Sequence, residues 1–278
     1  MGERFFSPSC IAPRIPYHVP MQILQTQDLV KSYRGRVVVD KVSFHVNDGE
    51  IVGLLGRNGA GKTTSFRMTM GMIDRDAGQV MFNGQDVSSL PMYQRAQRGM
   101  GYLSQEPSVF QRLTVEENLM AILETRRMNK ADRKARCEEL MQQFDLLKLR
   151  RQAARTLSGG ERRKLEIARA LITEPSLILL DEPFSGVDPV AVQELQGEIR
   201  KLRSEKNIAM LVTDHNVHHI LAVCDRVYVI ADGKVFAEGT PAQIIKDQKV
   251  REAYLGTLFK GDEFDEPATA GAGSTAAG

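Results

Sequence analysis

The sequence predicts an α/β fold in which a mostly parallel sheet carries a β-rich edge and an inserted helical segment. Three observations support this prediction. Apolar runs typical of buried strands alternate with helical patterns along most of the 278 residues. Short alternating segments fill residues 22–48, and helical patterns cover about 106–170. We therefore expect one large α/β domain with a helical insertion.

The β-rich edge comes first in the chain. Val37–Val39 and Val42–Val46 are β-branched or alternate between apolar and polar residues, which predicts short strands. Asp48-Gly49 supplies a turn after them. Residues 78–84 return to a strand and a turn. This part of the chain is expected to form an antiparallel subdomain.

Buried strands follow at three places, residues 51–55, 177–180 and 208–212, where continuous aliphatic runs are typical of parallel sheets covered on both faces. A helix over residues 62–72 follows the first of these strands. Residues 227–236 predict a hairpin around a central Asp-Gly.

Capping signals divide the helical segment. Thr114 and Glu117 form a T-x-x-E capping box, and Asn129 can cap a second helix. A third helix is expected to start at Ser158 and to stop before Pro175. Two later helices are predicted where an N-cap residue precedes proline, at Asp188-Pro189 and Thr240-Pro241.

Bulk properties exclude several classes of protein. A net charge of +2 gives no field that would favour nucleic acid, so no nucleic-acid partner is expected. No run approaches the roughly 20 apolar residues that span a bilayer, so a membrane role needs separate membrane subunits. Cys10, Cys137 and Cys224 are too widely spaced for a CxxC motif and suit a reducing cytosol.

The two ends differ in composition from the rest. Residues 1–20 hold four prolines and no continuous apolar region, which predicts a loose N-terminal tail and no secretory signal. Residues 257–278 are rich in Gly, Ala, Asp and Glu, which predicts a disordered C-terminal tail. The folded domain is expected to span 21–256.

A glycine-rich string follows the first buried strand. It fits the P-loop pattern, in which backbone N–H groups and a helix N-terminus face phosphate oxygens. Lys62 can reach the β- and γ-phosphates, and the Thr63 hydroxyl can coordinate Mg²⁺. The alternative is a strand–turn–helix corner without a ligand, in which a buried lysine would lack an anion. The predicted phosphate-binding residues are Gly56, Arg57, Asn58, Gly59, Ala60, Gly61, Lys62, Thr63 and Thr64.

A second glycine string, Leu157-Ser158-Gly159-Gly160-Glu161, lies roughly a hundred residues further on. The two strings together resemble the ATP-binding cassette (ABC) ATPase family, in which the second is the signature; two unrelated glycine turns are the alternative. The resemblance covers about residues 21–256. It implies a P-loop NTPase (RecA-like) core with an antiparallel β subdomain and an inserted helical subdomain. It also implies ATP as the cofactor, with Ser158, Gly159 and Gly160 touching it.

Asp181 and Glu182 follow an apolar strand at its C-terminal end, where ligands of open parallel sheets bind. Adjacent carboxylates on a strand end point in different directions, so one can serve Mg²⁺ while the other faces the attacking water. The resemblance assigns Asp181 to Mg²⁺ and Glu182 to the role of general base. The alternative is a surface Asp-Glu pair before a turn.

The resemblance alone suggests three more site residues. Gln105 resembles the glutamine that touches Mg²⁺ and the water, His215 the histidine that contacts the γ-phosphate, and Tyr33 the aromatic that stacks on adenine. Each has a plain structural alternative; Arg36, for example, can pack against the Tyr33 ring. His218 and His219 are interpreted as ordinary helix positions. A metal site from His215 and His219 is a formal alternative that lacks the H-E-x-x-H glutamate.

The spacing of the two strings suggests a head-to-tail homodimer in which each signature closes over the ATP of the other chain. Ser185–Asp188 resembles the D-loop at that contact. The family then implies two transmembrane partner subunits and a peripheral, cytoplasmic location on the inner membrane. Residues 181–189 and 213–217 are similar to the ATPases of lipopolysaccharide export systems. A branched-chain amino-acid-type importer ATPase and a non-hydrolysing ATP-binding regulatory module remain alternatives.

Val109, Phe110 and Leu113 lie between Gln105 and the Thr114 cap. They either fill a seam between subdomains or line a groove for a short cytoplasmic helix of a membrane subunit. Phe110 is the residue expected to dominate such an interface.

Overall fold

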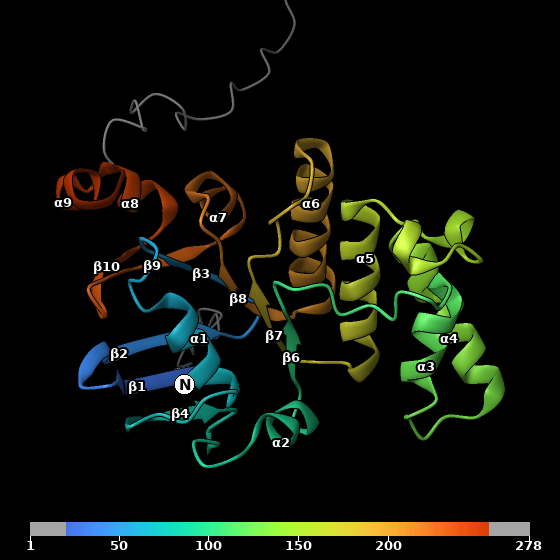
Figure 1. Ribbon diagram of the computed structural model, residues 1–278, viewed down its shortest axis with the longest axis horizontal. Coiled ribbons are helices and arrows are strands. Elements are labelled where there is room, and N and C mark those ends of the chain that lie inside the picture. Colours follow the sequence, from blue (N-terminus) through green and yellow to red (C-terminus); the bar gives the residue numbers. More distant parts are fainter. Residues whose placement is uncertain (1–20, 256–278) are drawn as a thin grey trace, which may run out of the picture.

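The computed structural model describes residues 21–255, so the predicted tails lie outside the described residues. Two sheets form the framework (Figure 1). The first is antiparallel and has the strand order β2-β1-β4-β5. Its strands are β1 (Gln22–Tyr33), β2 (Arg36–Asn47), β4 (Ala77–Phe82) and β5 (Gln85–Asp86).

The second sheet has six strands in the order β10-β9-β3-β8-β7-β6 and is parallel except for the β9–β10 hairpin. Its strands are β3 (Ile51–Leu55), β6 (Met100–Leu103), β7 (Leu177–Asp181), β8 (Ala209–Thr213), β9 (Arg226–Ala231) and β10 (Lys234–Gly239).

Helices connect the strands and build a separate helical region. That region contains α3 (Val115–Leu123), α4 (Lys130–Gln143) and α5 (Gly159–Ala170). Figure 1 shows α5 beside α3, which packs against α4, and it shows β6 and β7 between α5 and α1. The other helices are α1 (Lys62–Met70), α2 (Met92–Gln97), α6 (Pro189–Lys206), α7 (Val217–Val223), α8 (Pro241–Lys246) and α9 (Gln248–Val250). Short helical turns lie at Leu147–Leu149, Ala154–Thr156, Leu171–Thr173 and Arg251–Leu255.

The six-stranded sheet is buried on both faces. Along β3, Ile51 and Leu55 join one apolar cluster with the helical region, whereas Val52 and Leu54 join a second cluster with α1 and the antiparallel sheet. Successive side chains of a strand point to opposite faces, so a strand covered on both sides must be apolar throughout. This explains the continuous aliphatic runs and confirms the predicted α/β class.

The prediction of short strands in residues 22–48 was wrong. The segment forms two strands of 12 residues each, which pair with shifts of register. Asp28 and Lys41 have positive φ values of 46° and 53° beside those shifts. Such bulges interrupt the alternation of apolar and polar residues, so one long strand resembles several short ones in the sequence. The helix predicted to reach residue 72 ends at Met70, because Gly71 caps it with a φ of 75°.

Candidate functional site

The four strands β6, β7, β8 and β3 are adjacent and parallel, so their carboxyl ends meet at one edge of the sheet. Each end leads to a predicted site residue. The phosphate loop follows β3, and Gln105 follows β6. Asp181 ends β7, and His215 follows β8. Sheet order thus brings together residues that lie far apart in the sequence.

The phosphate loop contains three glycines with positive φ: Gly56 at 154°, Gly59 at 82° and Gly61 at 103°. Gly61 is also fixed by space, because a Cβ atom there would lie 2.7 Å from the Val38 carbonyl oxygen. Only glycine combines this backbone with this close approach. Arg57, Asn58 and Gly59 are exposed, so their backbone N–H groups are accessible to a phosphate.

Lys62 opens α1 and is 7% exposed. Its Nζ donates to the carbonyl oxygens of Gly56 at 2.5 Å and Arg57 at 3.0 Å. Burial lowers the pKa of Lys62, and the nearby carboxylates of Glu182 and Asp181 act in the opposite direction. The ammonium therefore lies inside the loop, where both carboxylates favour its charged form. Thr63 and Thr64 follow in the first turn of α1.

Gln105, Glu182 and His215 form a connected group. The Gln105 Nε2 donates to Glu182 Oε2 at 2.9 Å, and His215 Nδ1 lies 3.3 Å from the same oxygen. Glu182 has a φ of 45°, and its backbone N–H donates to the Thr213 carbonyl oxygen at 3.0 Å. A left-handed backbone at a non-glycine residue costs roughly 1 kcal/mol or more. The surrounding structure thus holds this carboxylate in one orientation.

Asp181 is the last residue of β7, directly before Glu182, and it is 2% exposed. Its Oδ1 accepts a hydrogen bond from Thr213 Oγ1 at 2.8 Å. Burial, the largest influence, raises the pKa of this carboxyl. A carboxylate in this position would be stabilised by a cation. Residues 21–255 contain no set of three His, Cys, Asp or Glu residues arranged to hold a metal ion by themselves.

The signature string starts α5. Ser158 is its N-cap and forms a reciprocal capping box with Glu161. A Cβ atom on Gly159 would lie 2.9 Å from the Gly186 carbonyl oxygen, and one on Gly160 would lie 2.6 Å from Ala191 Cβ. These glycines therefore allow the helix start to pack against the predicted D-loop and α6.

Tyr33 lies at the tip of the β1–β2 hairpin and is 46% exposed. The Lys31 Nζ lies 5.5 Å from its ring centroid, so Lys31 supplies a cation over the ring. On β2, Val38 contacts Gly61, which brings this hairpin to the phosphate loop. An exposed aromatic ring on this hairpin is suitable for stacking on a base.

Sequence reasoning missed a buried ion pair on α5. Arg163 and Glu166 are 5% and 4% exposed, and Arg163 Nη1 lies 2.9 Å from Glu166 Oε2. The guanidinium also donates to the carbonyl oxygens of Ser104, Asp181 and Pro183. It therefore joins the signature helix to the segments that carry Gln105 and Glu182. Arg163 and Glu166 are spaced i,i+3 on the face of α5 that also buries Ile167. This spacing was the sequence signal that could have predicted their burial.

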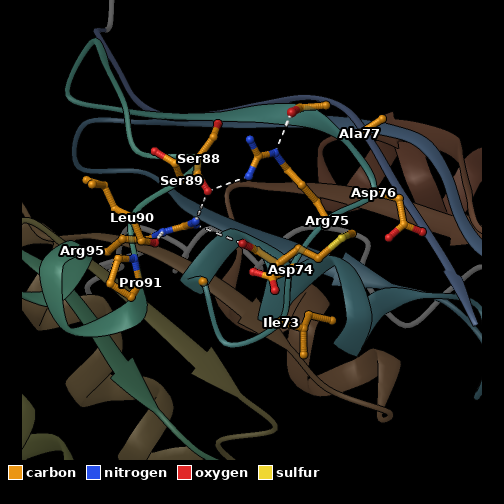
Figure 2. Close-up of a pocket in the computed structure, with 13 residues that line it drawn as sticks. Ile73, Asp74, Arg75, Asp76, Ala77, Ser88, Ser89, Leu90, Pro91 and Arg95 are labelled. Atoms are coloured by element: carbon orange, nitrogen blue, oxygen red, sulfur yellow. Dashed lines mark hydrogen bonds between the residues drawn. The ribbon is translucent and has the colours of Figure 1, made fainter.

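A second missed residue is Arg95, which supports the far end of α1 beside a cavity of about 400 Å³. Its guanidinium donates to the carbonyl oxygens of Met68 and Thr69 in the last turn of α1. Figure 2 shows Arg75 and Arg95 converging on Ser88, whose carbonyl oxygen accepts from both. Burial is the main cause that lowers the pKa of Arg95 to about 10, so it stays charged at neutral pH.

Another cavity, of about 630 Å³, borders the phosphate loop. Arg57–Ala60 form one side, and the β9–β10 hairpin, Arg36, Ala253 and Tyr254 form the rest. The Tyr254 hydroxyl donates to the Gly56 carbonyl oxygen at 3.2 Å, the same oxygen that Lys62 contacts. The last described residues of the chain therefore contact the phosphate loop directly.

In the segment after Gln105, one apolar residue is buried as a seam-filling residue would be, and another is exposed as a groove residue would be. Val109 is buried at 7% exposure and joins the core, whereas Phe110 is 44% exposed. The Arg169 guanidinium lies 4.6 Å from the Phe110 ring centroid. Phe110 is thus held in place and is accessible from solvent.

None of the helices in the described part of the chain has the length and apolar character needed to cross a bilayer. Comparison with known proteins gives two matches to families. Residues 39–185 match the ABC transporter family, and residues 234–260 match the branched-chain amino acid ATP-binding cassette transporter family.

Similar proteins agree with these matches. The lipopolysaccharide export system ATP-binding protein LptB of Haemophilus influenzae is 51% identical over 241 residues, which are 86% of this chain and 100% of that protein. LptB of Escherichia coli is 50% identical over the same shares. A crystal structure of an ATP-binding cassette of an ABC transporter in its ADP conformation superposes with a TM-score of 0.76 at 29% identity, covering 85% of this chain and 99% of that one. The chain therefore belongs to the ABC transporter family, as one of its ATP-binding subunits, which are ATPases.

Proposed function

We propose that this chain is the ATPase of a lipopolysaccharide export system, working as a head-to-tail homodimer with two transmembrane subunits. It would lie on the cytoplasmic face of the inner membrane. The observation that carries this proposal is the identity of about half of all residues with LptB proteins along their whole length. The match of residues 234–260 to branched-chain amino acid transporters favours an importer ATPase as the second candidate.

In the proposed cycle, the glycine loop binds the phosphates of ATP through its backbone N–H groups, and Tyr33 stacks on adenine. Lys62 exchanges the carbonyl oxygens of Gly56 and Arg57 for phosphate oxygens. This exchange satisfies a buried ammonium with an anion, which neutral carbonyl groups do only partly.

Mg²⁺ fits the oxygen-bearing residues beside this loop. Asp181 offers a buried carboxylate and Thr63 an exposed hydroxyl. Gln105 donates through Nε2 to Glu182, which leaves its Oε1 available for a cation or its water. When bound, the ion would neutralise charge that develops on the phosphates.

Glu182 is the proposed general base, and Gln105 and His215 hold it. Both contact Oε2, so Oε1 remains to accept a proton from water. The same two contacts position the carboxylate. Ser158, Gly159 and Gly160 would contact the ATP of the partner chain, because α5 lies on the far side of β6 and β7 from α1 in Figure 1.

Reconstitution tests the proposal. The complex would be purified from its source with its membrane subunits and placed in proteoliposomes, and release of lipopolysaccharide and uptake of branched-chain amino acids would be followed with ATP. ATP-dependent lipopolysaccharide release supports the proposal; amino-acid uptake without it would support the importer instead. A purified chain without turnover would favour the regulatory-module alternative.

A further inference from the structure

The residue after β8, Asp214, is fully buried and lies between two histidines. The Nδ1 atoms of His215 and His219 are each 3.6 Å from Asp214 Oδ1. Oδ1 also accepts from the Asn216 backbone N–H at 2.7 Å, whereas Asp214 Oδ2 and His219 Nδ1 are both buried without a hydrogen-bond partner within residues 21–255. An incompletely satisfied buried carboxylate attracts any nearby donor.

The hydrogen bonds around Asn216 determine which nitrogen of His219 carries the proton. The Asn216 Oδ1 caps α7 by accepting from the His218 backbone N–H at 3.0 Å. Its amide Nδ2 therefore faces His219 Nε2, 3.3 Å away, and donates to it. With Nε2 as acceptor, the neutral ring carries its proton on Nδ1, the atom that faces Asp214.

His219 also touches the loop of the proposed base. Its ring packs edge-on against Phe184, with centroids 5.2 Å apart and an interplanar angle of 68°. Phe184 lies two residues after Glu182 in the chain. From α6, Gln196 contacts the His219 carbonyl oxygen at 3.5 Å, and Arg200 donates to the Ala222 carbonyl oxygen of α7. One side chain thus connects the segment after β8 to the segment after β7.

We propose that His219 is a positioning residue for hydrolysis: its Nδ1–H faces Asp214 and leaves His215 free to hold Glu182. The proposal rests on the proposed roles of Glu182 and His215. His215 Nδ1 can donate to Asp214 or to Glu182, which lie 3.6 Å and 3.3 Å away. Without the His219 donor, Asp214 competes more strongly with Glu182 for the Nδ1–H group of His215. The His215 ring then turns away from Glu182. Lys62 and Tyr254 also interact with the Asp214 charge, and both remain in every variant below.

The test compares steady-state ATP hydrolysis by full-length chains in complex with their membrane subunits. His219→Phe keeps the ring packing and removes the donor, and His219→Asn restores an N–H near the Nδ1 position. Ala222→Ser, at an exposed position of the same helix, is the control. We expect His219→Phe to lower kcat roughly tenfold or more, since small misplacement of catalytic groups is costly. Its KM for ATP should stay within about twofold, because ground-state binding is unchanged.

His219→Asn should recover most of the lost kcat, and Ala222→Ser should match the wild type. The inference is overturned if His219→Phe has wild-type kcat, or if His219→Asn is as impaired as His219→Phe. If His219→Phe does not fold, His219→Met replaces it, because the flexible thioether adapts to irregular space. Glu182→Gln separates this inference from the proposed function. If that variant retains turnover, the roles of Glu182 and His215 fail; if it is inactive while His219→Phe is normal, only the inference about His219 fails.

Discussion

Gln105 and Glu182 are 77 positions apart in the chain, and the Gln105 amide donates to the Glu182 carboxylate at 2.9 Å. The bond joins the segment after β6 to the segment after β7. Because the segment after Gln105 also carries the exposed Phe110, we expect a partner that binds at Phe110 to affect the residue that contacts the proposed base. The predictions below test both ends of this connection.

Lys62→Ala should abolish most nucleotide binding, because the phosphates lose their main cation. We expect a loss of affinity of roughly a hundredfold, a size typical of buried charged contacts. Calorimetric titration with ATP measures it, and Lys201→Ala serves as control because Lys201 pairs with Glu198 on the surface. Unchanged affinity in Lys62→Ala would refute the phosphate-loop assignment.

Glu182→Gln should bind ATP and lose turnover by about 10²- to 10⁴-fold, since an amide keeps the shape but cannot accept a proton. It should also accumulate as an ATP-bound dimer, which size-exclusion chromatography with light scattering would detect. A near wild-type rate of phosphate release would show that the base lies elsewhere.

Ser158→Arg should stop hydrolysis in trans by blocking the signature that faces the partner's ATP. The lost N-cap costs about 1 kcal/mol, so the chain should still fold. Gly160→Asp is a poorer test, because a Cβ there meets Ala191 Cβ at 2.6 Å. Mixed with Lys62→Ala chains, Ser158→Arg should leave at most one competent site per dimer. Full activity from a gel-filtered monomer contradicts the head-to-tail arrangement.

Phe110→Ala should leave the isolated subunit folded and weaken its assembly with the membrane subunits. The side chain is 44% exposed, so little core packing is lost. Phe236→Ala is the matched control, with 43% exposure on β10. Melting temperature and co-purification yield are the two measurements. A large fall in melting temperature with normal assembly would favour the seam-filling role.

The sequence predicts the fold well where a local signal determines local structure. Capping residues such as Thr114 and Asp188 mark helix starts correctly, because a cap acts within one helical turn. It also predicts which site residues meet, because parallel strands place their carboxyl ends together. It misses Arg95 and Arg163, whose acceptors come from segments brought close only by the folded chain. A buried arginine and a surface arginine look alike in a sequence.

The Arg163 contacts have a consequence for the timing of the proposed dimer. Helix α5 begins at Ser158, which would contact the nucleotide bound by the partner chain. Through the Arg163 guanidinium, the same helix also binds the backbone of Ser104, Asp181 and Pro183, beside the chain's own nucleotide site. A shift of α5 in response to the partner's ATP would also displace the chain's own hydrolytic residues. The two nucleotide sites of the dimer would then be coupled. Each would sense the occupancy of the other, and ATP turnover would rise with concentration more steeply than a single-site hyperbola.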